Sequence, residues 1–215
     1  MSDGTVSLEQ LTAWLGRFAE LVTDQRAYLT ELDSAIGDAD HGANMARGMT
    51  AVMEKIGAGA PAGAADELFK SVGMTLVTSV GGASGPLYGT FFLRMGMTAG
   101  AVSSFDGAAL GTALRAGLEG VVARGKAEAG DKTMFDAMAP ALDAYDAAIA
   151  GGSTIPDAAA AALAAAEAGR DATLPLVARK GRASYLGERS AGHQDPGATS
   201  THLLLKAAAD AWSRA

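Results

Sequence analysis

The sequence contains no cysteine, which excludes disulfide bonds, thiolate catalysis and zinc sites built on cysteine ligands. Aromatic residues make up only 6% of the 215 residues, although 49% are hydrophobic. The core must therefore be built mainly from alanine, leucine, valine and methionine. Because the aromatic and β-branched residues that favour strands are scarce, this composition predicts closely packed helices.

An excess of basic residues is also missing, since the formal net charge is −7. Proteins that bind nucleic acid usually present a basic face, so we expect no nucleic-acid partner. A nucleotide is compatible with this charge, because a bound divalent cation reverses the local sign. The sequence has no apolar run of the roughly 20 residues that a membrane span needs and no signal peptide. We therefore expect a cytoplasmic protein without membrane contact, folded as a single domain over residues 1–215.

Apolar residues recur at helical spacing along most of the chain. In the first such segment Leu11, Leu15 and Phe18 share one face, and Ser7 with Gln10 predicts a capping box at its start. An alanine-rich tract over residues 147–168 indicates tight helix packing. The eight expected helices cover about residues 8–32, 44–56, 66–80, 86–97, 106–124, 133–149, 156–178 and 198–212, with Pro175 as a kink in the seventh.

These elements predict an all-α fold, an antiparallel up-and-down bundle or barrel of eight helices without a convincing strand. The loops after the first, third, fifth and seventh helices are the ones rich in glycine, serine and charged residues. Because antiparallel neighbours alternate in direction, these four loops share one end of the bundle. We expect the functional site at that end.

The first of these loops brings together three acidic residues, Asp33, Asp38 and Asp40. They cannot share one helix face, but Gly37 can end the helix and let the loop fold back towards Asp33. Carboxylate oxygens are the ligands that Mg²⁺ prefers. The alternative is a solvated acidic turn at a helix end. The segment His41 to Asn44 favours the metal site, because the start of a helix presents free N–H groups to phosphate.

The second loop, from Gly81 to Pro86, places small residues and Ser84 before another helix. Glycine lets backbone N–H groups approach a phosphate closely. This loop is not a P-loop, because the GxxxxGK[ST] spacing and the preceding strand are both missing.

The third loop runs from Gly125 to Met134 and has the composition of a solvated charged turn, with Thr133 as the cap of the sixth helix. The fourth, over residues 181–199, is long and polar, which indicates function or disorder in a compact domain. In it, Arg182 and Arg189 either contact phosphate or pair with Glu188 and Asp195 to stabilise the loop.

Four stretches in these loops carry a family resemblance: LDSAIGDADHGANMARGM, SVGGASGPLYGTFF, RGKAEAGDKTM and GRASYLGERSAGHQDPGAT. Together they resemble the nucleotide-binding L subunits of dihydroxyacetone kinases over residues 32–199. The resemblance implies an eight-helix antiparallel barrel with ADP or ATP at one end, and two Mg²⁺ ions held by Asp33, Asp38 and Asp40. The nucleotide-binding residues that it implies are His41, Gly42, Ala43, Asn44, Ala83, Ser84, Gly125, Met134, Arg182, Asp195, Pro196 and Gly197.

Many members of that family have glycine where this sequence has Ala39. The difference matters only if the backbone there has a positive φ, which glycine adopts without strain.

The resemblance implies one subunit of a phosphotransferase. ADP would stay bound as a cofactor, a phosphohistidine on an M subunit fed by phosphoenolpyruvate would rephosphorylate it, and a K subunit would hold dihydroxyacetone. Phosphoryl transfer depends mainly on positioning and charge neutralisation, which suits a metal-nucleotide site. The sequence offers no evident triose pocket or base, so we expect the partner subunits to supply both.

Two other readings of the same resemblance stay open. In one, the chain is part of a two-component ATP-dependent ketose kinase, and ATP binds and ADP leaves in each cycle. In the other, it is a nucleotide-sensing module that docks onto a transcriptional regulator. A homodimer is compatible with all of these readings. An unrelated all-α magnesium enzyme acting on diphosphates would leave the second and fourth loops unexplained.

Overall fold

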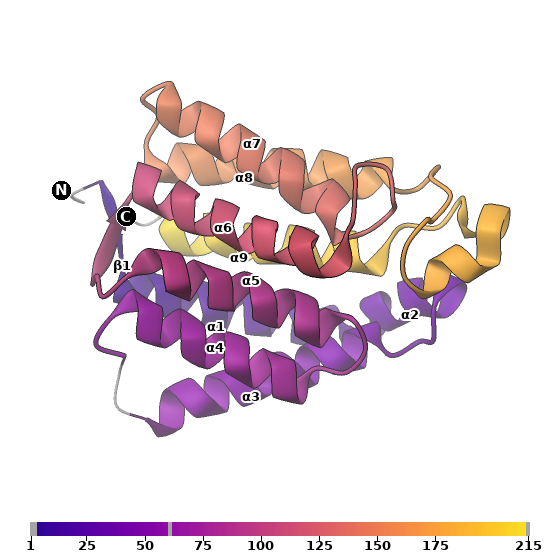
Figure 1. The fold of residues 1–215 in the computed structure, drawn as a ribbon, viewed down its shortest axis with the longest axis horizontal. Helices are drawn as coiled ribbons and strands as arrows, with labels where there is room; N and C mark the ends of the chain where they lie inside the picture. Colours follow the sequence, from indigo (N-terminus) through magenta and orange to yellow (C-terminus); the bar gives the residue numbers. More distant parts are fainter. Residues whose placement is uncertain (1–3, 60–61, 214–215) are drawn as a thin grey trace.

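The computed structural model describes residues 4–59 and 62–213 of the chain. The described residues form nine α-helices, one 3₁₀ helix and two short strands (Figure 1). In chain order they are β1 (Thr5–Ser7), α1 (Leu8–Asp24), α2 (Arg26–Ile36), α3 (His41–Ala58), α4 (Ala65–Ser79), α5 (Ser84–Ala99), β2 (Ser104–Asp106), α6 (Gly107–Gly125), α7 (Met134–Ala150), α8 (Ile155–Ala172), η1 (Arg182–Ser190) and α9 (Pro196–Trp212).

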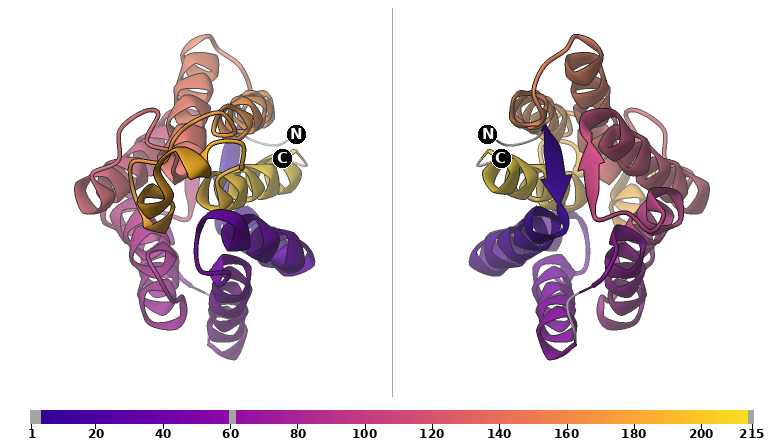
Figure 2. Two further views of the ribbon diagram at one scale, coloured as in Figure 1. Left: turned by 90° about the vertical axis from the view of Figure 1, so that its right-hand side faces the viewer. Right: turned by 90° about the vertical axis from the view of Figure 1, so that its left-hand side faces the viewer.

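The long helices pack as a closed antiparallel ring (Figure 2). Helices α3 to α9 each contact the next along the chain, α9 contacts α1, and α1 contacts α3. The predicted all-α barrel is confirmed. Among the described residues, no helix combines the length and the apolar character that crossing a membrane requires.

Inside the ring, aromatic residues from distant helices meet. Trp14 of α1 lies 5.2 Å from Trp212 of α9 and 5.8 Å from Phe92 of α5, measured between ring centroids. One side of the alanine tract on α8 faces inward, with Ala158 and Ala166 fully buried and Ala159 and Ala162 nearly so. The tract therefore packs tightly, as its composition predicted.

The expectation of no strand was wrong in one detail. β1 and β2 pair antiparallel, with Val6 opposite Phe105 and both side chains buried. Each strand has only three residues, and the partners lie about a hundred positions apart in the sequence. A local pattern cannot show such a pair. It joins the N-terminal segment to the end of the barrel where α1 and α6 begin (Figure 1).

Several helix boundaries also differ from the expected ones. The first helix is divided at Gln25 into α1 and α2, and the seventh ends at Ala172, which leaves Pro175 in the following loop instead of at a kink. Three helices start earlier than expected, α3 at His41, α5 at Ser84 and α9 at Pro196. These changes matter for function, because the three helix starts move into the predicted site.

Candidate functional site

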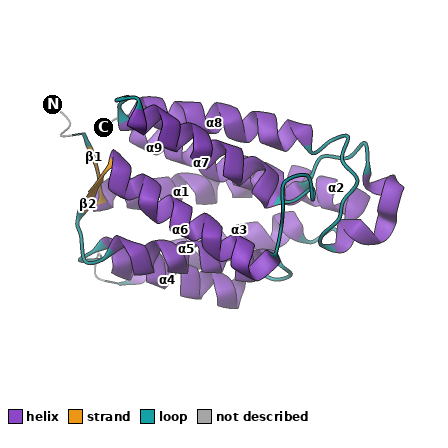
Figure 3. Cartoon of the chain, turned by 45° about the horizontal axis from the view of Figure 1, so that its top comes forward, coloured by secondary structure: helices purple, strands orange, loops and turns teal. Residues whose placement is uncertain are grey.

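Four loops meet at the end of the barrel where α2 ends, as the sequence predicted (Figure 3). They enclose a cleft of about 510 Å³. Its walls come from the loop after α2, the loop after α4, the residues before α7 and the long segment between α8 and α9.

The helices α3, α5, α7 and α9 all begin at this cleft. Two of them are capped by side chains: Thr133 accepts from an N–H group in the first turn of α7, and Asp195 does so for α9. The starts of α3 and α5 have no side-chain cap. Backbone N–H groups in an uncapped first turn lack an intrahelical partner and carry partial positive charge, which suits a phosphate.

The carboxylates of Asp33, Asp38 and Asp40 converge beside these uncapped starts. Each offers an oxygen, and the three oxygens lie within 4.8 Å of one another. Asp33 is buried in the last turn of α2, and its Oδ2 accepts the backbone N–H of Asp40 at 2.8 Å and of His41 at 3.0 Å. These two bonds hold the start of α3 against the end of α2. Clustered hard oxygens at this separation fit a divalent cation such as Mg²⁺.

The turn that carries Asp38 and Asp40 depends on its small residues. A side chain at Gly37 would collide with the carboxylate of Asp33. Ala39 has a φ of +62°, in the left-handed region. A residue with a Cβ atom pays about 1–2 kcal/mol for that conformation. Because φ at residue 39 is positive, glycine would fit this position with less strain than Ala39 does.

Arg182 reaches the acidic cluster from η1. Its Nε donates to Oδ2 of Asp38 at 2.9 Å, and both side chains are exposed. Neither Glu188 nor Asp195 is its partner here. An exposed ion pair contributes only about 0–1 kcal/mol, so Arg182 can exchange Asp38 for a phosphate at little cost.

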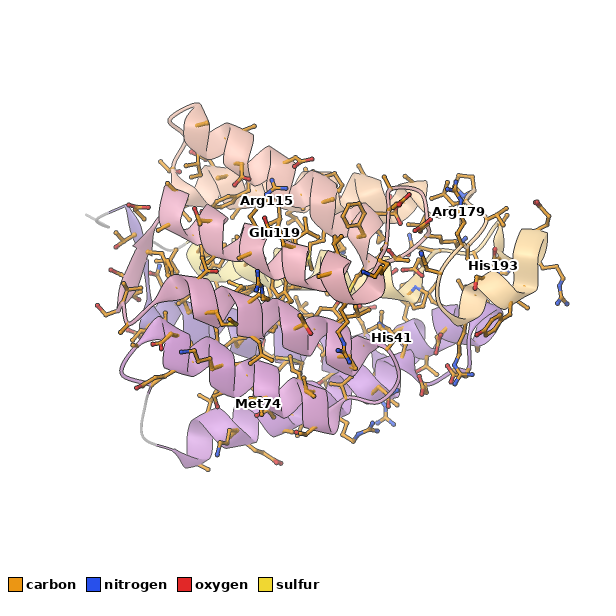
Figure 4. All side chains as sticks on the ribbon, viewed as in Figure 1. His41, Met74, Arg115, Glu119, Arg179 and His193 are labelled. Atoms are coloured by element: carbon orange, nitrogen blue, oxygen red, sulfur yellow. The ribbon has the colours of Figure 1, made fainter. Side chains whose placement is uncertain are left out.

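His41, labelled in Figure 4, links three helices through a chain of hydrogen bonds. Its Nδ1 lies 3.0 Å from Oγ of Ser84, and its Nε2 lies 2.9 Å from Oγ of Ser200. The chain continues from Ser200 to the hydroxyl of Tyr88 at 2.8 Å. Burial lowers the pKa of His41 and raises the pKa of Tyr88 to about 12. The chain is therefore uncharged at neutral pH, and it fixes the Ser84 hydroxyl at the start of α5.

Asp195 is buried at the opposite wall of the cleft. Its Oδ2 accepts the N–H of Ala198 at 2.6 Å, and its own N–H donates to Oγ1 of Thr173 at 3.0 Å. Burial raises the pKa of Asp195 to about 7, and the nearby carboxylate of Asp136 adds to the rise. Near neutral pH this group is thus part protonated, and no full negative charge faces the cleft from this wall.

A family model described as the DAK2 domain matches residues 35–210. The chain belongs to this family. Its relatives include the PEP-dependent dihydroxyacetone kinase, ADP-binding subunit DhaL, of Escherichia coli (strain K12), which is 46% identical over 94% of this chain and 96% of its own length. The PTS-dependent dihydroxyacetone kinase, ADP-binding subunit DhaL, of Lactococcus lactis is 44% identical over the same shares of the two chains.

Solved structures of a longer protein have the same fold. The dihydroxyacetone kinase from C. freundii in complex with AMP-PNP and Mg²⁺ superposes with a TM-score of 0.71 and 29% identity. The match covers 93% of this chain but 33% of that one, so this chain spans about a third of the longer kinase.

The cleft of this DAK2 domain contains most of the residues implied by the resemblance. Those that line it are Asp33, Asp38, Asp40, His41, Ala83, Ser84, Met134, Arg182, Asp195, Pro196 and Gly197.

Four further residues, Gly42, Ala43, Asn44 and Gly125, lie outside the lining. Gly42 packs against the backbone of Arg26 in α2, and Asn44 is buried against Gly81. The metal and nucleotide contacts assigned to all fifteen residues, including the eleven that line the cleft, stay predictions.

The third loop corrects the expectation of a solvated charged turn. Asp131 is 3% exposed and Lys132 only 1%. Lys132 lines the cleft floor, yet its Nζ donates to backbone carbonyls of the segment between α8 and α9, and burial lowers its pKa. Sequence reasoning missed this residue, because nothing in a charged turn tells which way a lysine points.

Proposed function

We propose that this chain is the ADP-binding subunit of a dihydroxyacetone kinase whose phosphoryl group comes from phosphoenolpyruvate. The observation that carries the proposal is the placement of three carboxylates within 4.8 Å of one another beside the uncapped starts of α3 and α5. It is supported by relatives of nearly equal length and 44–46% identity that bear this name.

In this proposal Asp33, Asp38 and Asp40 hold two Mg²⁺ ions. Bound there, the ions supply charge neutralisation and orientation for the phosphates, which is the main requirement of phosphoryl transfer. Apart from the N–H of His41, which donates to Asp33, the N–H groups in the first turns of α3 and α5 bind phosphate oxygens from the protein side, together with the hydroxyl of Ser84. A C. freundii kinase of the same fold, solved with AMP-PNP and Mg²⁺, supports this placement.

The nucleoside then lies towards the capped helices α7 and α9. Met134 of α7 and Pro196 of α9 give this side of the cleft apolar surface. Arg182 can turn from Asp38 to a phosphate, where a guanidinium forms two parallel hydrogen bonds. The wall formed by α3 and α5 thus binds the phosphates, and the wall formed by α7 and α9 binds the nucleoside.

The cleft lacks an available general base in the described part of the chain. Both ring nitrogens of His41 have hydrogen-bond partners, and Asp195 caps α9. We propose that a K-type subunit holds dihydroxyacetone and accepts its hydroxyl proton. A phosphohistidine of an M-type subunit gives its phosphoryl group to bound ADP, and the resulting ATP passes the group to the hydroxyl. The chain binds and orients the nucleotide in both transfers.

The experiment starts with the purified chain. We expect denaturation to release about one ADP per chain that dialysis has not removed. With K subunit and dihydroxyacetone present, we expect turnover with phosphorylated M subunit and none with free ATP. Full turnover on free ATP would instead establish the exchanging, ATP-dependent kinase.

A third outcome distinguishes a regulatory role. Tight nucleotide binding without transfer from either donor would refute the kinase proposal and favour a nucleotide sensor. In that case a transcriptional regulator becomes the partner to look for. Light scattering in the same experiments decides between monomer and homodimer, and cell fractionation tests the expected cytoplasmic location.

A further inference from the structure

The side chain of Lys132 is enclosed by the segment between α8 and α9. Its Nζ donates to the backbone carbonyl of Ser190 at 2.7 Å, of Leu176 at 3.0 Å and of Leu174 at 3.5 Å. An ammonium group has three N–H donors, and the carbonyls of Ser190 and Leu176 take two of them, with the carbonyl of Leu174 at the outer limit for the third. A buried charge is tolerated only when it is hydrogen-bonded in this way. Lys132 thus holds two distant parts of one segment, and its donors are directed to these carbonyls.

The backbone of Lys132 is in an uncommon conformation. Its φ is +63°, a region that residues other than glycine rarely adopt. The residue directly precedes Thr133, the cap of α7. A glycine would adopt this turn without strain, so the reason for a lysine lies in its side chain.

The segment that encloses the Lys132 side chain, residues 173–195, has little apolar packing of its own. Its buried hydrophobic contacts form a small cluster of Ile36, Ala178 and Ala183. Polar bonds supply the rest: Oγ of Ser190 accepts the N–H of Ala178 at 2.8 Å, and the N–H of Gly192 donates to Leu174 at 2.8 Å. These bonds surround the ammonium group. The segment is therefore held mainly by polar bonds, and those to Lys132 are among them.

The same segment forms one wall of the cleft. It carries Arg182 and Tyr185 to the rim, and it ends at Asp195, where α9 begins. Displacing it would move all three groups relative to the acidic cluster on the other wall.

We propose that Lys132 is a positioning residue, whose buried ammonium folds residues 173–195 into the wall that holds the nucleotide. The ammonium group acts on this segment as a structural metal ion acts in other proteins, because backbone carbonyls gather around a fixed positive charge. The effect on nucleotide binding rests on the proposed function, whereas the effect on the segment does not.

The first test removes the side chain and supplies it again. Lys132→Gly keeps the left-handed turn, and we expect cleavage within residues 173–195 by a protease to become faster and MgADP affinity to fall about tenfold or more. n-Butylammonium, which matches the lost side chain, should restore both, whereas n-butanol should not. Lys126→Gly is the matched control, because Lys126 lies in the same loop at a φ of +53° with an exposed side chain.

Two results would overturn the proposal: an unchanged segment in Lys132→Gly, or equal recovery with butanol and butylammonium. Because the protease assay needs no nucleotide, a chain that fails to bind ADP but shows the amine rescue refutes only the proposed function.

A second test uses the unmodified chain, in case the variant does not fold. In NMR spectra of protein with ¹⁵N-labelled lysine side chains and ¹³C-labelled carbonyls, Lys132 should give a protected ammonium signal. We expect scalar couplings from its nitrogen to the carbonyl carbons of Leu176 and Ser190. An ammonium in fast exchange with water, without these couplings, would contradict the arrangement.

Discussion

Replacing Ala39 by glycine should stabilise the protein, although glycine usually destabilises. Ala39 has a φ of +62°, and its side chain is exposed, so the substitution removes no packing. Relief of the left-handed conformation gains about 1–2 kcal/mol. The greater freedom of glycine in the unfolded chain costs about 0.5–1 kcal/mol. The balance is a gain of up to about 1.5 kcal/mol, or up to about 6 °C in melting temperature for a chain of this size.

The matched control is Ala13→Gly. Ala13 is exposed in the middle of α1, where glycine should lower stability by about 0.5–1 kcal/mol. Urea and thermal unfolding of both variants, with and without MgADP, measure the difference in sign. If Ala39→Gly destabilises the chain as much as Ala13→Gly does, the turn between Asp38 and Asp40 is not strained, and its geometry around the acidic cluster must be different.

Three further changes test the site and its support. Asp38→Asn should leave the free energy of unfolding within about 1 kcal/mol of the unaltered chain, because Asp38 is exposed and pairs with Arg182 at the surface. Titration calorimetry should show MgADP binding weakened about tenfold or more, as loss of a metal ligand requires. The exposed control Asp24→Asn should bind normally, and normal binding by Asp38→Asn as well would refute the metal assignment. The pKa of Asp195 is raised from 3.8 to about 7, so the folded chain keeps a proton there that the unfolded chain loses. The stability that protonated Asp195 contributes is present below about pH 4 and is lost as pH rises towards 7, by up to about 4 kcal/mol. Asp195→Asn should lack this loss. If the free energy of unfolding of the two proteins changed with pH in parallel, the expectation would be contradicted. Gly42→Ala should cost about 1–3 kcal/mol in urea unfolding, because the added methyl group meets the backbone oxygen of Arg26; Gly57→Ala, in the same helix with open space around it, should stabilise instead.

Local chemistry explains why much of the fold could be predicted from sequence. The Ser7–Gln10 capping box and the caps at Asp106 and Thr133 depend on residues three positions apart or fewer, and the structure has all three. The clustering of four loops at one end follows from the alternation of helix direction. Asp33 and Asp40 meet because one glycine ends α2 between them.

What the sequence could not show depends on distant partners. Gln25 divides the first helix without a glycine or proline, so only packing against α3 and α9 determines the break. Val6 and Phe105 form strands only because each finds the other. Lys132 looked like a solvated residue, because its three acceptors lie 42 to 58 positions further along the chain.

Loop length decides the electrostatics of the cleft. In an antiparallel barrel each end receives both N-terminal and C-terminal helix ends, so their partial charges would largely cancel. Here the starts of α3, α5, α7 and α9 line the cleft, whereas among the described residues only α2 contributes its last turn to the lining. The long connections after α6 and α8 separate those two C-terminal ends from the cleft. An excess of helix N-termini therefore faces the acidic cluster. The N-termini suit the phosphates and the carboxylates suit the metal, so the cleft suits a metal-polyphosphate complex better than a free cation or a free polyphosphate.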